Sequence, residues 1–260
     1  MEQDLDNLIE EMKELGWEIL NYNDAIDVSK KHFSNEMLKL LAFLKDTHVD
    51  LKRHVITGGG GKSEMVQDLE KEFKKNGWKK NNISVKNNIS FLNSVPDKVT
   101  ESSSHEVDHL IVNDENILSI LEIEWNNKSE FFDRDIHNIQ SAWNIGATEL
   151  GIIITRSKKL NESMTEDIYQ FFVENEINDY SDFEKIKNNP DVIRFSFPSQ
   201  SHRRTIDRRG DRDFTQVAAE VFWTSKYKDT TFTEQLIKRV ERGQLGRAPL
   251  IVFGLPPVKK

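Results

Sequence analysis

The order of elements in the middle of the chain limits its fold more than any other feature of the sequence. "VDHLIV" (107–112) and "ILSILEIEW" (117–125) have the composition of strands and flank the polar "NDEN", which predicts a β-hairpin. "SEFFDRDIHNIQSAWNIGA" (129–147) has apolar residues at helical spacing, and "ELGIIIT" (149–155) predicts a short buried strand. This order of strands and helix indicates an α/β protein with a mixed sheet.

Amphipathic segments flank this pattern on both sides. Helical spacing of apolar residues also occurs over 4–15, 34–45, 63–77, 162–175 and 231–243. "APLIVFGL" (248–255) predicts a last core strand, whereas residues 176–229 are polar and irregular, and we expect short strands there. The fold class predicted is therefore α/β, with a central mixed β-sheet flanked by helices.

The length and composition of the chain exclude several kinds of protein. With 260 residues, the chain can bury a full hydrophobic core as one domain. It has no cysteine, which excludes disulfides and thiolate metal sites and is compatible with a reducing cytoplasm. Residues 1–17 are acidic and amphipathic, unlike a signal peptide, and no apolar stretch approaches the length of a membrane span. We therefore expect a soluble protein with no membrane partner.

Arginines are concentrated in one segment of an otherwise acidic chain. The net charge of −8 argues against nonspecific coating of nucleic acid, because that binding depends on lysine and arginine neutralising phosphates. Residues 194–212 nevertheless contain only two acidic side chains, Asp207 and Asp211, and are locally basic. The basic residues are Arg194, His202, Arg203, Arg204, Arg208, Arg209 and Arg212.

A run of glycines in "VITGGGGKSEM" (55–65) is similar to a phosphate-binding loop. The Walker pattern, however, requires a glycine where this sequence has Ile56. "LKRHVITG" could pass for the preceding strand, but no second apolar strand ending in an acidic Mg²⁺ ligand follows at the usual distance. We therefore expect no nucleotide. The loop runs into a predicted helix N-terminus, which attracts phosphate, so a DNA phosphate suits it as well; a flexible surface loop is the alternative.

The second strand of the hairpin carries two carboxylates on one face. Glu122 and Glu124 are two residues apart, so their side chains point to the same side of the strand. Apolar side chains point to the opposite side; they are Leu121, Ile123 and Trp125. Acidic residues make up 44 of 260, so the spacing arises easily by chance. Its position, within an otherwise apolar strand that precedes a helix and a buried strand, is the stronger argument for a site.

Asp108 completes this acidic group if the hairpin turn is short. A three-residue loop at 114–116 places Asp108 directly opposite Glu122. Like charges facing each other across strands are destabilising, and a divalent cation between them would remove that penalty. Hard oxygen ligands without cysteine point to Mg²⁺.

These segments together resemble a known family. "VDHLIVNDENILSILEIEWNNKSEFFDRDIHNIQ" and "ELGIIITRS" resemble the core of type II restriction endonucleases of the BamHI, BglII and BstYI group, in the PD-(D/E)XK nuclease superfamily. In that core an Asp begins one strand, an E-x-(E/Q) lies on the next, and a helix and a strand follow. "EFKKNGWKK" and "LIKRVERGQLGRAPLIVFGLPP" are similar to the pre-core helix and the closing segment. The resemblance covers residues 60–156 and 230–257.

The resemblance implies a restriction-endonuclease-like fold and a type II site-specific deoxyribonuclease. One endonuclease domain would span residues 1–260. Its parts would be an N-terminal helical part (1–50), a catalytic core (60–156), a DNA-recognition segment (176–229) and a closing helix and strand (230–257).

The resemblance also implies the roles of the acidic residues. Asp108 and Glu122 would bind Mg²⁺ together with the carbonyl oxygen of Ile123. Glu124 stands where most of the superfamily has lysine, so it would hold a second metal ion or orient and deprotonate the attacking water. The catalytic set is thus Asp108, Glu122 and Glu124. Some relatives add a fourth carboxylate near the end of the preceding helix, but "NGWKKNN" offers none there.

The substrate and partners follow from the same resemblance. Enzymes of this group cut palindromic double-stranded DNA as homodimers, because a twofold protein mirrors a twofold site. Hydrolysis would need Mg²⁺ and no nucleotide, in a bacterial or archaeal cytoplasm that also contains a companion DNA methyltransferase. The helix over 129–143 is a candidate dimer element, although its apolar residues would equally suit packing on the sheet. They are Phe131, Phe132, Ile136, Ile139 and Trp143.

Two regions are predicted to contact DNA. Lys62 and Ser63 follow the glycines and are candidates for phosphate contacts. Segment 198–212 is the candidate for reading bases, since arginine can donate two hydrogen bonds to guanine. Its candidate residues are His202, Arg203, Arg204, Arg208, Arg209 and Arg212, and a solvated basic loop is the alternative.

Two other functions compete with restriction. One is a noncatalytic DNA-binding protein on the same fold, and the other is a nuclease for repair or for modified DNA. The presence of all three acidic residues favours cleavage over binding alone.

Overall fold

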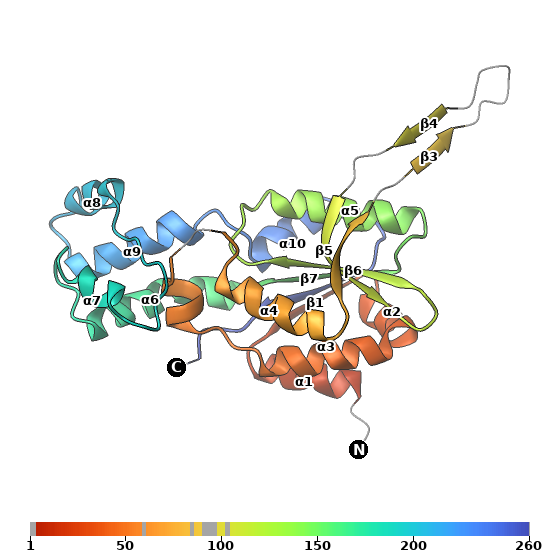
Figure 1. The fold of residues 1–260 in the computed structure, drawn as a ribbon, viewed down its shortest axis with the longest axis horizontal. Helices are drawn as coiled ribbons and strands as arrows, with labels where there is room; N and C mark the ends of the chain where they lie inside the picture. Colours follow the sequence, from red (N-terminus) through yellow and green to blue (C-terminus); the bar gives the residue numbers. More distant parts are fainter. Residues whose placement is uncertain (1–3, 59–60, 84–85, 90–97, 102–104, 260) are drawn as a thin grey trace.

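The computed structural model describes residues 4–58, 61–83, 86–89, 98–101 and 105–259. Its centre is a six-stranded sheet in the order β1-β8-β7-β6-β5-β2, and a two-stranded sheet pairs β3 with β4 (Figure 1). The strands are β1 Glu18–Tyr22, β2 Lys79–Ile83, β3 Lys86–Ile89, β4 Lys98–Glu101, β5 His105–Val112, β6 Leu118–Glu124, β7 Leu150–Arg156 and β8 Leu250–Leu255.

Helices make up most of the remaining regular structure. They are α1 Leu5–Glu14, α2 Ala25–His32, α3 Ser34–Asp46, the π-helical turn η1 Leu51–Ile56, α4 Glu64–Lys75, α5 Phe131–Asn144, α6 Lys158–Glu174, α7 Phe183–Lys187, α8 Gln200–Asp207, α9 Phe214–Tyr227 and α10 Thr233–Glu241.

The sheet is mixed, as the order of elements predicted. β5 and β6 form an antiparallel hairpin, whereas β6, β7 and β8 are parallel to one another. β1 and β2 are antiparallel to their neighbours at the two edges. Every residue of β7 and β8 is buried, as expected for parallel strands covered on both faces. The predicted α/β class with a central mixed sheet is therefore confirmed.

Helices cover both faces of the sheet and divide the core into two clusters. Phe132 of α5 and Leu236 of α10 belong to one cluster with Ile120 of β6. Leu121 and Ile123 of β6 belong to the other, together with residues of α1, α3, α4 and α6. In Figure 1, α5 and α10 lie above the sheet and α1 to α4 below it. Because side chains alternate along a strand, Glu122 and Glu124 are on the same face as Ile120, which is the α5 face.

The hairpin of β5 and β6 has the predicted register. Its pairs run from His109 with Leu121 to Val112 with Leu118. The Asn113 N–H donates to the carbonyl oxygen of Ile117 at 3.1 Å, which closes a three-residue loop over 114–116. Asn116, the last loop residue, has φ +62°, the left-handed conformation typical of such loops.

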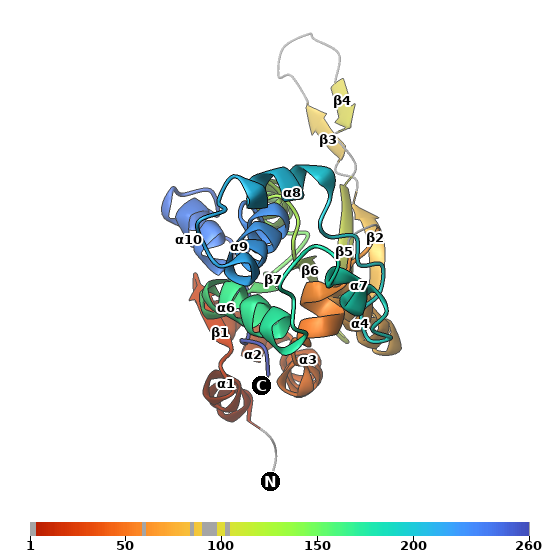
Figure 2. The ribbon, with the colours of Figure 1, turned by 90° about the vertical axis from the view of Figure 1, so that its left-hand side faces the viewer.

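The short strands predicted over residues 176–229 are wrong. These residues form α7, α8 and α9 and contain no strand. Asp213 caps α9 by accepting a hydrogen bond from the Gln216 N–H at 2.7 Å. Apolar residues such as Val217 and Val221 then recur at helical spacing and are buried. Phe197 and Phe222, whose ring centroids are 5.2 Å apart, pack the segment around α9. Figure 2 shows α6 to α9 together as one helical lobe.

Several further segments were not anticipated, β1 and η1 among them. Residues 18–22 form β1, which pairs with β8 from Glu18 opposite Gly254 to Tyr22 opposite Leu250. Residues 51–56, considered as a strand, form η1 instead, and the Asp50 carboxylate accepts from the Arg53 N–H at 2.7 Å at its start. The glycine run therefore follows a π-helical turn and not a strand.

Candidate active site

Asp108 and Glu122 are joined across the hairpin by reciprocal hydrogen bonds. The Asp108 Oδ2 atom accepts from the Ile123 N–H at 3.0 Å, and the Glu122 Oε2 atom accepts from the Asp108 N–H at 3.1 Å. The register places the two residues opposite each other, as predicted. Glu122 is 1% exposed, whereas the Asp108 side chain is 24% exposed. Backbone donors thus stabilise two like charges held side by side.

A cavity of about 220 Å³ lies against this pair. Asp108 and Ile123 line it from the hairpin, and Asn127 lines it from the segment after β6. Lys62 and Glu70 line it from the glycine loop and α4; we call it the carboxylate cavity. Glu122 and Glu124 are almost fully buried and do not line it.

Glu70 is an acidic residue that the sequence analysis missed. The fourth carboxylate was sought near the end of the helix, but α4 places Glu70 one turn earlier, beside Asp108. Lys62 forms an ion pair with both carboxylate oxygens of Glu70. Lys62 precedes α4, so no spacing within that helix pointed to this pair.

Lys80 of β2 is a second residue that the sequence analysis missed. Its Nζ atom is 3.2 Å from Asp108 Oδ1, 3.1 Å from Glu106 Oε1 and 4.0 Å from Glu70 Oε1. Desolvation lowers the pKa of Lys80, but the carboxylates of Glu106 and Asp108 outweigh it, so the pKa is raised. Lys80 is therefore a charged ammonium at the edge of the carboxylate cavity.

Glu124 is in a different environment from Asp108, because it lies beside α5 and not beside α4. Its Oε2 atom accepts from the Asn127 side chain at 2.8 Å, and Arg134 lies 3.6 Å from its Oε1 atom. Asp135 of α5 is fully buried and accepts two hydrogen bonds from Arg134, at 2.9 and 2.7 Å. Burial and the neighbouring Asp135 carboxyl raise the pKa of Glu124 to about 9. Glu124 therefore holds a proton at neutral pH in this state of the protein.

A buried arginine fixes the segment that follows β6. Arg156, at the end of β7, donates to the carbonyl oxygens of Trp125 at 2.9 Å and Thr231 at 3.1 Å, and to the Asn161 side chain at 2.9 Å. The Thr231 N–H in turn donates to the Asn127 carbonyl at 2.9 Å. These bonds hold Asn127 between Glu124 and the carboxylate cavity.

The glycine loop is attached to the segment 176–229. The Gly58 N–H donates to the carbonyl oxygen of Ile193 at 2.8 Å. At the other end of the loop, Ser63 caps α4, because its hydroxyl accepts from the Val66 N–H at 3.3 Å. Arg194 pairs with Glu64 of α4 at 3.0 Å. The loop is thus held at both ends beside the cavity.

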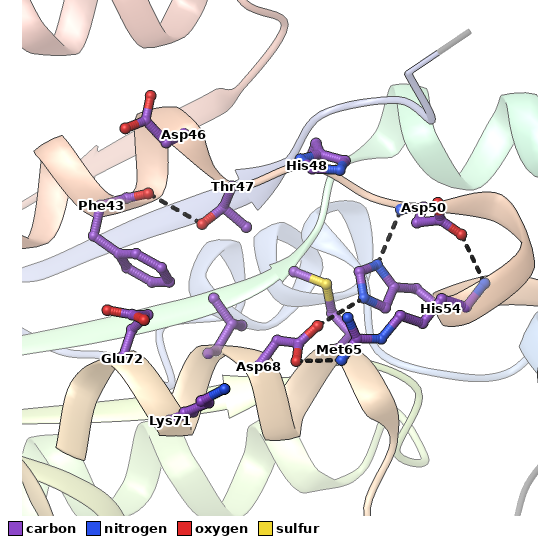
Figure 3. Close-up of a pocket in the computed structure, with 12 residues that line it drawn as sticks. Phe43, Asp46, Thr47, His48, Asp50, His54, Met65, Asp68, Lys71 and Glu72 are labelled. Carbon is purple, nitrogen blue, oxygen red and sulfur yellow. Dashed lines mark hydrogen bonds and ion pairs between the residues drawn. The ribbon is translucent and has the colours of Figure 1, made fainter. Parts of the chain in front are cut away.

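A second hollow, of about 330 Å³, lies on another face of α4 (Figure 3). Asp68 accepts a hydrogen bond from Arg53 at 2.6 Å, and its other oxygen is 3.2 Å from Nε2 of His54. The Asp50 N–H donates to Nδ1 of His54 at 3.0 Å. Burial lowers the pKa of His54, and Asp68 opposes this shift. These contacts anchor α4 to η1 and support the helix that carries Glu70.

The predicted DNA-reading arginines lie on and after α8, in the helical lobe (Figure 2). Arg203 stacks over the Tyr180 ring at 4.7 Å. Arg209 and Arg212 both pair with Glu220 of α9. Arg204 and Arg208 are exposed, and no ion pair joins either of them to the part of the chain that the structure describes.

His202 lies at the start of α8 and lines a neighbouring cavity. Its Nδ1 atom accepts from the Ser199 N–H at 3.2 Å in a capping box at the start of α8. Together with Phe197 and Lys226 it lines a cavity of about 220 Å³ that is also bordered by Asn126. Because Asn126 also lines the carboxylate cavity, the two cavities are neighbours.

Most of the apolar residues proposed for dimer contact are in the core. Phe132, Ile136 and Ile139 of α5 are fully buried against the sheet. The alternative of packing on the sheet is therefore correct for these three residues. Phe131 is 37% exposed and Trp143 is partly buried.

Comparison with known proteins connects this geometry to one family. A protein-family model described as restriction endonuclease BglII/BglIII matches residues 17–255. No curated protein matches the chain. Within the described ranges, no helix has both the length and the apolar character needed to cross a bilayer. The matched range includes the hairpin, the glycine loop, α4, α5 and the arginine-rich segment.

Proposed function

The chain belongs to the BglII/BglIII family of restriction endonucleases, which makes it a type II site-specific deoxyribonuclease, and from this premise we propose that it hydrolyses both strands of a short palindromic DNA site with Mg²⁺. The observation that carries the proposal is the reciprocal bonding of Asp108 and Glu122 beside the carboxylate cavity. It holds Asp108 at the cavity, where a DNA phosphate can enter, and keeps the buried Glu122 beside it.

The donor atoms at the cavity suit Mg²⁺, which prefers hard oxygen ligands. Asp108 and the carbonyl oxygen of Ile123, together with the buried Glu122, would hold the ion, and Glu70 would add a third carboxylate from α4. The described side chains do not yet converge at metal-binding distances, so binding requires the carboxylates to rearrange. When bound, the ion polarises the scissile phosphate and lowers the pKa of a coordinated water.

The residues around Glu124 would orient the attacking water. Asn127 fixes one oxygen of Glu124, and Arg134 lies near the other. In the free protein, burial and the neighbouring Asp135 carboxyl favour the protonated form of Glu124. Glu124 would accept a proton from water only after that proton has left, so Asp135 and Arg134 would tune its basicity.

Binding and specificity would come from the remaining elements. Lys62, Ser63 and the glycine amides would contact phosphates, and the exposed arginines of 198–212 would read bases. A homodimer would place one carboxylate cavity on each strand of a palindrome. This function implies a companion methyltransferase that protects the host's own sites.

One digest tests the proposed function. Purified protein is incubated with long unmethylated duplex DNA and Mg²⁺, with EDTA and a Glu122→Gln variant as controls, and the fragment ends are sequenced. We expect discrete fragments whose ends share a short palindrome. Intact DNA that is nevertheless retarded on a gel would identify a noncatalytic DNA-binding protein. Cutting only of modified or damaged DNA would identify the other alternative.

A further inference from the structure

The cavity of about 220 Å³ that His202 lines is walled by aromatic rings and adjoins the carboxylate cavity. Phe195, Phe197 and Phe222 line it together with His202, and we call it the aromatic cavity. The centroid of the Phe197 ring is 5.0 Å from that of His202 and 5.2 Å from that of Phe222. Asn126 lines both cavities. A nucleotide bound at the carboxylate cavity would therefore have the aromatic cavity beside it.

Hydrogen bonds between α9 and η1 form the aromatic cavity before any ligand binds. The Lys226 ammonium donates to the Val55 carbonyl oxygen at 2.6 Å, and the Tyr227 hydroxyl donates to the same oxygen at 2.9 Å. Lys226 also donates to the carbonyl oxygen of Thr57, next to Gly58, which lines the cavity. These bonds join the helical lobe to the start of the glycine loop, so the cavity is preformed, as is usual for binding sites.

Three polar side chains at the aromatic cavity have unused hydrogen-bonding groups. Nδ1 of His202 accepts from the Ser199 N–H at 3.2 Å, so the proton of the neutral ring is on Nε2. Burial lowers the pKa of His202, which favours this neutral form. Within the described ranges, neither that N–H nor the side chains of Asn126 and Ser196 form a hydrogen bond. They offer donors and acceptors that match those on the edge of a nucleobase.

The lining suits a neutral planar group better than a phosphate. Lys226 is the one lysine or arginine among the described residues that line the aromatic cavity, and its ammonium is already bonded to two carbonyl oxygens. Phenyl rings stack on the π face of any base. The volume of about 220 Å³ is below the roughly 300–1,000 Å³ of sites for drug-sized ligands, so it suits a single planar ring system.

We propose that one nucleobase beside the scissile phosphate turns out of the DNA stack and enters the aromatic cavity. The inference rests on the proposed function, because it takes the DNA backbone to lie at the carboxylate cavity. Phe197 and Phe222 would contact the face of the base, and Asn126 and His202 would bond its edge. Such a base would be read outside the helix, independently of the arginines of 198–212.

Duplexes with one unpaired base test the inference. Each contains the site found by digestion, with one base placed opposite an abasic position, and the Glu122→Gln protein keeps the DNA intact. Turning out a base costs less when it has no pairing partner. We expect one position beside the cut to give binding at least several-fold tighter than the fully paired site. A 2-aminopurine next to that position should gain fluorescence several-fold on binding, because it loses a stacking neighbour.

A larger side chain in the aromatic cavity gives the matched comparison, again with Glu122→Gln. Ser225 is exposed and lines the cavity, so Ser225→Phe should fill the space without entering the core. Both the tighter binding and the fluorescence gain should then be lost. Thr224→Phe adds the same ring at an exposed neighbour outside the cavity lining and should retain both signals. Circular dichroism of each variant checks that the fold is retained.

Two kinds of failure are distinguishable. If protein that binds the site lacks either signal at every position, or if Ser225→Phe retains both, the inference is wrong and the proposed function stands. If the wild type neither cuts nor binds DNA, the proposed function fails and the inference fails with it.

Discussion

The α-carbon of Gly58 lies so close to the backbone of Arg194 that a β-carbon there would be 1.6 Å from the Arg194 carbonyl oxygen. This approach joins the start of the glycine loop to the beginning of the arginine-rich stretch 194–212. Arg194 itself has φ +53°, an uncommon conformation for a residue with a side chain. The glycine run is thus explained at this position by backbone packing, not by nucleotide binding.

Replacing Gly58 should therefore disrupt this junction. We expect Gly58→Ala to lower the free energy of unfolding by about 1 to 3 kcal/mol, because the methyl group forces the two backbones apart. Urea denaturation measures this loss. Gly210→Ala is the control, since its β-carbon would be 3.2 Å from the Asp207 carbonyl oxygen and meet a milder contact. Equal losses in both variants would contradict a specific role for the Gly58 approach.

Glu122→Gln should abolish cleavage but leave DNA binding intact. Glutamine keeps an oxygen that can accept from the Asp108 N–H, so the hairpin should fold as before. It removes the negative charge that would bind Mg²⁺, so we expect a loss on the order of a thousandfold in cleavage rate. Rate measurements and gel retardation on the same DNA check both parts. Cleavage at the wild-type rate would show that the acidic pair is not the active site.

The hairpin site could be predicted because its geometry is local in sequence. The loop length fixes which residues face each other, and strand alternation fixes which side they point to. Asp108 and Glu122 therefore fall opposite each other, as the sequence alone indicated. The catalytic roles of these residues remain proposals.

The rest of the site could not be derived in this way. Glu70, Lys80 and Asp135 come from α4, β2 and α5, and only the packing of those elements brings them to the hairpin. Edge strand β1 was missed for the same reason, because its partner β8 lies near the other end of the chain. The helix α9 was missed because the polar and arginine-rich segment before it made the whole range 176–229 read as irregular. Local patterns carry no information on such distant contacts.

Lys226 should make the stability of the protein depend on pH. Its ammonium donates to the carbonyl oxygens of Val55, at 2.6 Å, and Thr57, at the base of the glycine loop. Burial lowers the pKa of Lys226 to about 7, so the unfolded chain binds this proton more tightly than the folded one. The folded state should therefore become more stable as pH rises from about 7 toward the ordinary lysine pKa, by up to about 1.4 kcal/mol per pH unit.

Comparison with Lys226→Met isolates this contribution. The variant keeps the apolar stem but has no proton to exchange, so its free energy of unfolding should rise less between pH 7 and 9 than that of the wild type. Urea denaturation at several pH values gives both slopes. Parallel slopes would mean that the two carbonyl oxygens keep Lys226 charged throughout, and that burial does not dominate.

Arg204 provides the sharpest test of sequence reading, because its guanidinium is exposed and forms no ion pair with the described residues, whereas Arg212 is already engaged by Glu220. If Arg204 contacts a base, Arg204→Ala should reduce the preference for the cognate site over random DNA by about 1 to 3 kcal/mol.

Lys62 contacts Glu70 in the free protein and would turn to a phosphate when DNA binds. Lys62→Ala should therefore weaken binding to both DNAs alike and reduce the salt dependence of binding by about one ion. Binding titrations on the site found by digestion, at several salt concentrations, distinguish the two patterns. An equal loss on cognate and random DNA for Arg204→Ala would assign that residue to the phosphate backbone and leave base reading to another part of the lobe.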